Sequence, residues 1–171
     1  MSQRVAKFEK VSFPQFKLDL LTCCGVSANG VPVNFAEDVY KEIRLPERAT
    51  KYSAGYDFFT PVNVHIGRDE VVKIPTGIRC TMIPDNVLML YPRSSLGFKY
   101  GIRLMNSTGI IDADFAFAQN EGHILLCLTA DQPVDLTAGQ KIAQGIFLPY
   151  GLTLDDDVQE VRHGGFGSTG K

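Results

Sequence analysis

This sequence lacks both long apolar runs and an excess of positive charge. No stretch of about 18 consecutive apolar residues occurs, which argues against a membrane-spanning helix. Residues 1–10 also lack the apolar core that a signal peptide carries. The formal net charge is −2, so no overall basic field favours nucleic acid or a membrane surface. We therefore expect a cytoplasmic protein that binds neither nucleic acid nor membranes.

Cysteine is scarce, and its spacing does not suggest a metal site. The chain has four cysteines and three histidines. Cys23 and Cys24 are adjacent, whereas Cys80 and Cys127 stand alone in apolar stretches. Because no pair has C-x-x-C spacing with histidines nearby, we expect reduced thiols and no zinc.

Internal repeats, low-complexity segments and long amphipathic helices are also missing from residue 51 onward. Short apolar runs separated by Gly, Pro, Asp and Asn occur there instead, at 70–74, 77–83, 87–91, 123–130 and 142–148. Several short strands at this spacing predict an all-β antiparallel sandwich or barrel. A length of 171 residues and a hydrophobic content of 44% are sufficient for one sizeable core, so we expect a single domain.

The first 42 residues have a different pattern. The sequence at 12–15, Ser-Phe-Pro-Gln, resembles a capping box, and apolar residues follow it at helical spacing, which predicts a short helix. A turn-rich stretch at 25–32 separates this helix from a second apolar set. That second set fits one or two helical turns that run into a strand, and its members are Phe35, Val39, Tyr40 and Ile43.

The segment 162–170 contains four glycines, two hydroxyl side chains and one aromatic ring, a composition that cannot build a core. Glycine lets backbone N–H groups approach oxyanions, Arg162 can pair with a phosphate, and Phe166 offers a face for a base. The segment is therefore a candidate nucleotide lid. The alternative is an ordinary glycine-rich tail.

Three more segments carry side chains suited to a nucleotide. Residues 91–97 place Arg93 beside two serines after an apolar strand, and 106–115 combine an amide, a glycine, two carboxylates and an aromatic ring. Residues 139–147 contain Gln144 as a polar side chain in an apolar strand. Each segment has a structural alternative: a solvated turn, a hairpin with Asn and Asp in turn positions, and a strand glutamine whose hydrogen bonds are satisfied.

Taken in order, these segments resemble the five motifs of the homotrimeric dUTP diphosphatases, the dUTPases. The resemblance covers residues 43 to 170, and the order and spacing make it specific. The matching segments are 54–58, 92–97, 106–115, 143–147 and the glycine-rich terminus.

The resemblance implies a jelly-roll-like all-β subunit of a homotrimer, with an extension at 1–42 packed on the domain, a β domain at 43–158 and a lid arm at 159–171. It implies hydrolysis of dUTP to dUMP and pyrophosphate, which lowers dUTP and supplies dUMP for thymidylate synthesis. Mg²⁺ would be held through the triphosphate and water, not directly by side chains. Asp112 would hold the attacking water, Asp57 would give electrostatic support, and a hairpin at 106–115 would read uracil. The substrate-binding residues would be Arg93, Ser94, Ser95, Asn106, Gly109, Phe115, Gln144, Arg162, Phe166, Gly167, Ser168 and Thr169.

The chain departs from the family pattern in the third and fifth motifs and at its N-terminus. Phe115 stands where tyrosine is usual, and residues 116–121 form an insertion that makes Phe117 an alternative for packing on the sugar. Arg162 lies one residue closer to the Gly-Gly pair than usual, and residues 1–42 extend beyond a minimal subunit.

Two other functions remain open at this point. The first is a dCTP deaminase of the same fold, which would need Glu121 in the pocket. The second is a nucleotide-sensing regulator that binds a protein partner through the extension or the insertion.

Overall fold

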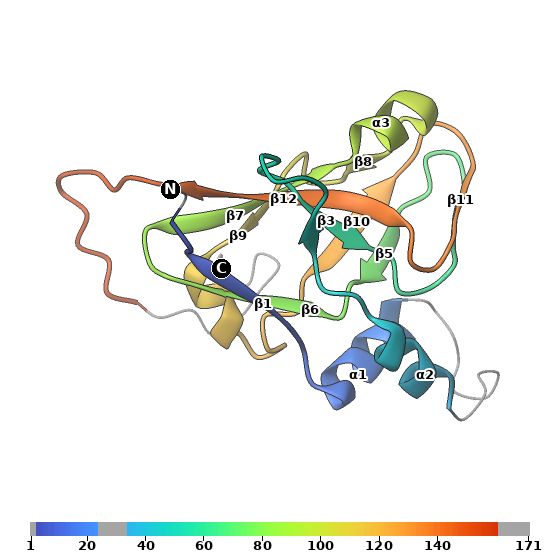
Figure 1. Cartoon of the computed structure of the whole chain (residues 1–171), viewed down its shortest axis with the longest axis horizontal. Helices are drawn as coiled ribbons and strands as arrows, with labels where there is room; N and C mark the ends of the chain where they lie inside the picture. Colours follow the sequence, from blue (N-terminus) through green and yellow to red (C-terminus); the bar gives the residue numbers. More distant parts are fainter. Residues whose placement is uncertain (1–2, 24–33, 161–171) are drawn as a thin grey trace.

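The computed structural model of the chain describes residues 3–23 and 34–160. Figure 1 shows strands crossing the middle of the molecule, with the helices α1 and α2 packed together on one side. In chain order the elements are β1 (Ala6–Lys10), α1 (Phe13–Cys23), α2 (Phe35–Glu42), β2 (Glu47–Arg48), β3 (Tyr56–Phe59), β4 (Val64–Ile66), β5 (Val72–Pro75), β6 (Ile78–Met82), β7 (Asn86–Pro92), α3 (Ser94–Tyr100), β8 (Arg103–Leu104), β9 (Gly109–Ile111), the 3₁₀ helix η1 (Ala113–Phe117), β10 (Leu125–Thr129), β11 (Val134–Leu136) and β12 (Lys141–Pro149).

Within the described ranges, the strands pair antiparallel in four sheets. The largest has the order β2-β3-β12-β7-β9, and a second has the order β5-β10-β8. Two strand pairs, β1 with β6 and β4 with β11, complete the set. The apolar runs predicted as strands all form strands, and the prediction of an antiparallel all-β fold of the jelly-roll type is confirmed.

The segment 106–115 does not form the hairpin that we expected. The strand just before this segment, β8, pairs with β10, whereas β9, within the segment, pairs with β7 in the other large sheet. The chain between them therefore crosses from one sheet to the other. Local sequence could not show this, because both pairing partners are distant in the chain.

The predicted helix over the first apolar set is confirmed as α1, which buries Phe16 and Leu20 completely or almost completely. Burial of two such side chains contributes roughly 3–6 kcal/mol. The second apolar set forms α2 and then leads to β2, so both parts of that interpretation are realised. The sequence did not indicate β1, which is anchored by Phe8 against Phe58 and Phe147, with ring centroids 5.6 Å apart in each pair.

Part of the outer face of the five-stranded sheet is apolar. Side chains of β7, β9 and β12 alternate, so the residues between the buried ones share this outer face. Paired across the strands are Val87 with Leu148, Met89 with both Ile146 and Ile110, and Tyr91 with Gln144. Ile110 is 61% exposed and Leu148 42% exposed.

The chain after β12 leaves the body of the protein. Residues 151–160 are all exposed, and Figure 1 shows this segment running away from the sheets. Among the residues that the structure describes, no helix has the length and apolar character needed to cross a bilayer.

Candidate active site

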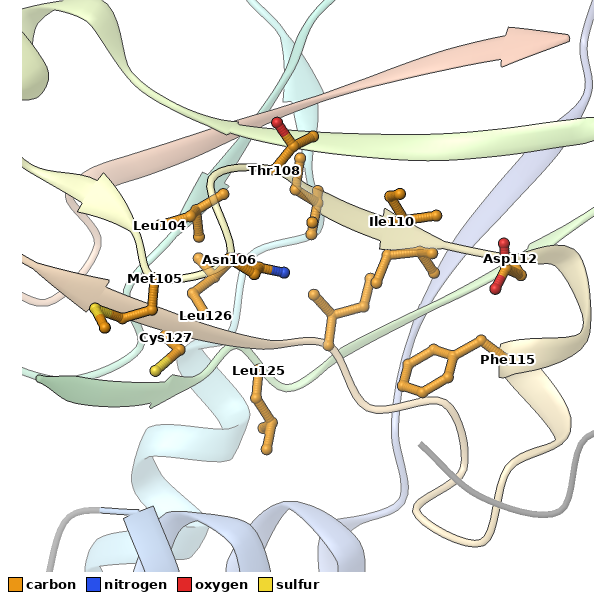
Figure 2. Close-up of a pocket in the computed structure, with 14 residues that line it drawn as sticks. Leu104, Met105, Asn106, Thr108, Ile110, Asp112, Phe115, Leu125, Leu126 and Cys127 are labelled. Atoms are coloured by element: carbon orange, nitrogen blue, oxygen red, sulfur yellow. The ribbon is translucent and has the colours of Figure 1, made fainter. Parts of the chain in front are cut away.

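A cavity of about 650 Å³ opens between the two large sheets, where the chain crosses from β8 to β9 (Figure 2). Its walls are mostly apolar, with a few polar groups, which is typical of a small-molecule site. The lining residues are Leu90, Leu104, Met105, Asn106, Thr108, Gly109, Ile110, Ile111, Asp112, Phe115, Ile124, Leu125, Leu126 and Cys127.

Four of the predicted site residues meet in this cavity: Asn106, Gly109, Asp112 and Phe115. Figure 2 shows Asp112 and Phe115 together at one end, with Asn106 nearer the other. Phe115 is 7% exposed, and its N–H donates to the carbonyl of Asp112 at 3.1 Å. This turn starts η1 and holds the carboxylate and the ring at the same end of the cavity.

Burial distinguishes the two phenylalanines considered at the third motif. Phe115 lines the cavity, whereas Phe117 is 76% exposed and is not part of the lining. Glu121 is also outside the cavity wall, and its carboxylate accepts hydrogen bonds from Ser12. A deaminase that needs this glutamate in the pocket is therefore not supported.

A second group of predicted residues gathers around Asp57, outside the cavity lining. Asp57 Oδ1 lies 3.1 Å from Arg93 Nη1, and its Oδ2 lies 2.7 Å from Lys141 Nζ. The Asp57 side chain is 8% exposed, while those of Arg93 and Lys141 are about one-third exposed. One nearly buried carboxylate thus holds two partly exposed cationic side chains, and the cluster has a net positive charge.

Lys141 was not among the predicted site residues. It begins β12, and the bulge between Lys141 and Ala143 shifts the register of β12 against β3. The only sequence signal was a lysine three residues before Gln144, and many surface strands have such a lysine.

Gln144 lies on the same face as Asp57, because these two residues are direct partners across β3 and β12. A Cβ on Gly55 would lie 2.9 Å from Gln144 Oε1, so a larger residue at this position would make the Gln144 amide shift. Ser94 and Ser95 are exposed in the first turn of α3, next to Arg93. The second and fourth motifs therefore meet at the Asp57 cluster, while the third motif forms the cavity.

The remaining predicted site residues, Arg162, Phe166, Gly167, Ser168 and Thr169, lie outside the described residues. Within the described part of the chain, no three His, Cys, Asp or Glu side chains group closely enough to hold a metal ion. Asp57, which is already engaged by two cations, is not suited to be a metal ligand.

Comparison with known proteins matches residues 41–170 to the family model of the dUTPases. The chain belongs to the dUTPase family. A deoxyuridine 5'-triphosphate nucleotidohydrolase of Lactococcus lactis is 40% identical over 133 residues, covering 75% of this chain and 89% of that protein. The dUTPase of Streptococcus mutans, a crystal structure, has a TM-score of 0.61 and 32% identity, covering 85% of this chain and 97% of the other.

A second solved dUTPase structure has lower sequence identity to this chain. A mutant dUTPase from phage phi11 of S. aureus shows the coordination of a structural Mg(II) ion. It matches this chain with a TM-score of 0.57 at 22% identity, over 68% of this chain and 90% of that one. At this identity the two proteins are compared in fold alone. The family match begins at residue 41, after β1 and α1.

Proposed function

We propose that this dUTPase-family chain hydrolyses dUTP to dUMP and pyrophosphate, with Asp112 orienting the attacking water. The observation that carries the proposal is the cavity in which Asp112, Asn106, Gly109 and Phe115 meet inside the family-matched region. A carboxylate at the end of an apolar cavity can hold a water and accept its proton as the bond to phosphorus forms.

Base selection follows from the same cavity. Asn106 and the backbone at Gly109 present donors and acceptors to the uracil edge, and cytosine would leave these groups unpaired. A close-fitting wall excludes the 5-methyl group of thymine. Phe115 packs flat on the deoxyribose, which leaves no room for a 2′-hydroxyl.

The triphosphate requires cationic and hydrogen-bonding groups, and the Asp57 cluster supplies them. Arg93, Ser94, Ser95 and Gln144 contact the phosphates, while Asp57 orients Arg93. Mg²⁺ neutralises charge on the triphosphate when bound. The side chains fit an ion carried by phosphate oxygens and water, because the carboxylate nearest to the phosphate-binding group is engaged by Arg93 and Lys141.

The lid arm, 159–171, completes the site in this proposal. Phe166 stacks on uracil, and Arg162, Gly167, Ser168 and Thr169 contact the phosphates. The exposure of residues 151–160 supports this role, because the segment that precedes the lid extends away from its own domain and is free to reach a neighbour.

A homotrimer is part of the same proposal. The cavity and the Asp57 cluster are separate groups within one chain, so a neighbouring chain can bring its phosphate-binding group to this chain's cavity. The apolar outer face at Met89, Ile110 and Ile146 supplies surface for such an interface. Residues 43–158 form the β domain, and 1–42 form an extension that packs on it.

The cysteines agree with the proposed location of the protein in the cytoplasm. Cys80 and Cys127 are thiols and not disulfide partners, as expected in a reducing cytoplasm. Burial raises the pKa of Cys80 to about 12, which keeps this thiol unreactive.

A regulatory protein partner would bind at the insertion, where the aromatic side chain of Phe117 is 76% exposed.

A nucleotide panel tests the activity. With dUTP, dTTP, dCTP and UTP and excess Mg²⁺, we expect pyrophosphate release from dUTP to exceed that from each other nucleotide by about two orders of magnitude or more in kcat/KM. Ammonia is measured in parallel. Ammonia from dCTP without pyrophosphate from dUTP would replace the proposal with a deaminase.

Substitution of Asp57 by Asn tests the orientation of Arg93. Removing the charge that holds both cations should lower kcat/KM for dUTP about tenfold to a hundredfold, since a hydrogen bond to a charged group is worth ~1.5–3 kcal/mol. Steady-state kinetics measure the effect, and Asp131→Asn, which breaks the exposed pair with Arg103, is the control. If Asp57→Asn lowers only the melting temperature, the cluster is structural.

A further inference from the structure

Residues 116–123, here called the linking loop, join two walls of the cavity. Phe115 precedes the loop and Ile124 follows it, and both residues line the cavity. The loop folds back on its own start, because a Cβ at Gly122 would lie 2.6 Å from Ala116 Cα and 2.7 Å from Phe115 O. The two backbones are therefore in contact, and a shift of the loop must displace Phe115.

Consecutive backbone hydrogen bonds connect Asp112 with this loop. The N–H of Phe115 donates to the carbonyl of Asp112. The N–H of Ala118 donates to Phe115 O at 3.0 Å, and the N–H of Glu121 donates to Ala118 O at 2.8 Å. The turns follow one another without a gap, so the position of Glu121 is transmitted through backbone to the end of the cavity where Asp112 and Phe115 lie.

The N-terminal segment binds the loop at Glu121. The backbone N–H and the hydroxyl of Ser12 donate to the two carboxylate oxygens of Glu121, at 2.7 and 2.6 Å. These bonds lower the pKa of Glu121. The φ angle of Glu121 is 59°, a left-handed conformation that is strained for a residue other than glycine, so the bonds to Ser12 help to hold this backbone.

The same segment binds the end of the loop at His123, whose side chain is fully buried. Its Nε2 accepts the N–H of Gly77 at 2.8 Å. Because a backbone N–H can only donate, Nδ1 carries the ring proton and donates to Asp19 Oδ2 at 2.5 Å. Burial lowers the pKa of His123 against the opposing effect of Asp19, which agrees with a neutral ring.

We propose that α1 positions the linking loop through Asp19 and Ser12 and thereby sets the affinity of the cavity for the nucleotide. Both contacts come from a part of the chain that precedes the family-matched region. The extension thus acts on the site from behind the cavity wall, through Phe115 and Ile124, and does not touch the substrate. Asp19 and Ser12 are positioning residues.

We expect loosening of the linking loop to change KM more than kcat. Phe115 and Ile124 form walls that contact the bound nucleotide in the ground state and in the transition state alike, so loosening them weakens both. Asp112 has separate support, since the preceding Ile111 is paired with Leu88 in the five-stranded sheet.

Asp19→Ala tests the inference, with Asp19→Asn as the conservative partner. Alanine removes the acceptor of the buried His123 proton, whereas asparagine keeps an oxygen in its place. We expect Asp19→Ala to raise KM for dUTP about two- to thirtyfold, the range of remote coupling effects, with kcat within about twofold of wild type. Asp19→Asn should restore most of the affinity, and Glu121→Ala should raise KM in the same way as Asp19→Ala.

Two controls separate positioning from general stability. Glu37→Ala removes a carboxylate of α2 that pairs with Lys41 and should leave KM unchanged. Val134→Ala makes a core defect in β11 and should lower the melting temperature without raising KM. All variants are assayed as the full chain, well below the lowest melting temperature.

The inference rests on the proposed hydrolysis of dUTP, and the two can fail separately. A wild-type chain that releases no pyrophosphate from dUTP contradicts the proposed function. If the wild type is active but Asp19→Ala and Glu121→Ala keep its KM, or lose kcat at an unchanged KM, the positioning role is wrong. A KM for Val134→Ala as high as that of Asp19→Ala would also overturn it, since any loss of stability would then suffice.

Discussion

Asp112→Asn is expected to lower kcat for dUTP by on the order of 10² or more, while nucleotide binding and the melting temperature stay close to wild type. Asparagine has nearly the same shape as aspartate and fills the same place in the cavity. It cannot accept the proton of the attacking water, so the loss falls on the chemical step. Single-turnover pyrophosphate release and titration with a non-hydrolysable dUTP analogue measure the two quantities.

The neighbouring carboxylate supplies the control for this variant. Asp114 lies two residues further on in η1 and is not part of the cavity lining. Asp114→Asn makes the same chemical change at almost the same place in the chain, and its kcat should stay within about threefold of wild type because Asp114 does not line the cavity. Wild-type turnover in Asp112→Asn would remove this residue from the mechanism.

Mixing two inactive variants should restore activity if sites are shared between chains. One variant carries Asp112→Asn and the other ends before Val161, and each alone is expected to be nearly inactive. After the two are unfolded together and refolded, a site with Asp112 from a truncated chain and a lid from the other variant is complete. With random assembly into closed homo-oligomers, about a quarter of the sites should be complete.

The separately refolded variants, combined afterwards without unfolding, are the control for this experiment and should stay inactive. Size measurements and a tag on one variant establish that mixed trimers have formed. If mixed trimers form but their activity equals that of the separate variants, each chain closes its own site and the shared-site proposal is wrong.

For the Asp57 cluster, the sequence identified two of the residues but not the contacts between them. Arg93 was identified by its neighbours Ser94 and Ser95, and Asp57 by its place in the first motif. That Asp57 joins Arg93 to Lys141 depends on the pairing of β3 with β12 and on the bulge in β12. Strand register between segments about 80 residues apart is decided by packing of the whole sheet, so no local pattern could reveal it.

At the capping box, residues 12–15, the sequence predicted the start of the helix but not all of the hydrogen-bond partners. The N–H of Gln15 donates to Ser12 Oγ at 3.3 Å, as predicted, and α1 begins there. In a complete box the Gln15 side chain would accept the N–H of Ser12, but Glu121 accepts it instead, and Gln15 donates to Asp19. A stronger, charged acceptor from a distant segment displaced the local partner.

The sequence by itself determined five of the strands after residue 70, namely β5, β6, β7, β10 and β12, together with the helix at the N-terminus, the family and the segments that contribute to the candidate site. These are properties of short stretches: apolar alternation, turn residues and motif order. Only the tertiary structure decided that 106–115 crosses between two sheets, that Phe115 and not Phe117 lines the cavity, and that Asp19 meets His123. Each of these facts depends on segments far apart in the chain, which are brought together because the apolar faces of the whole domain must be buried at once.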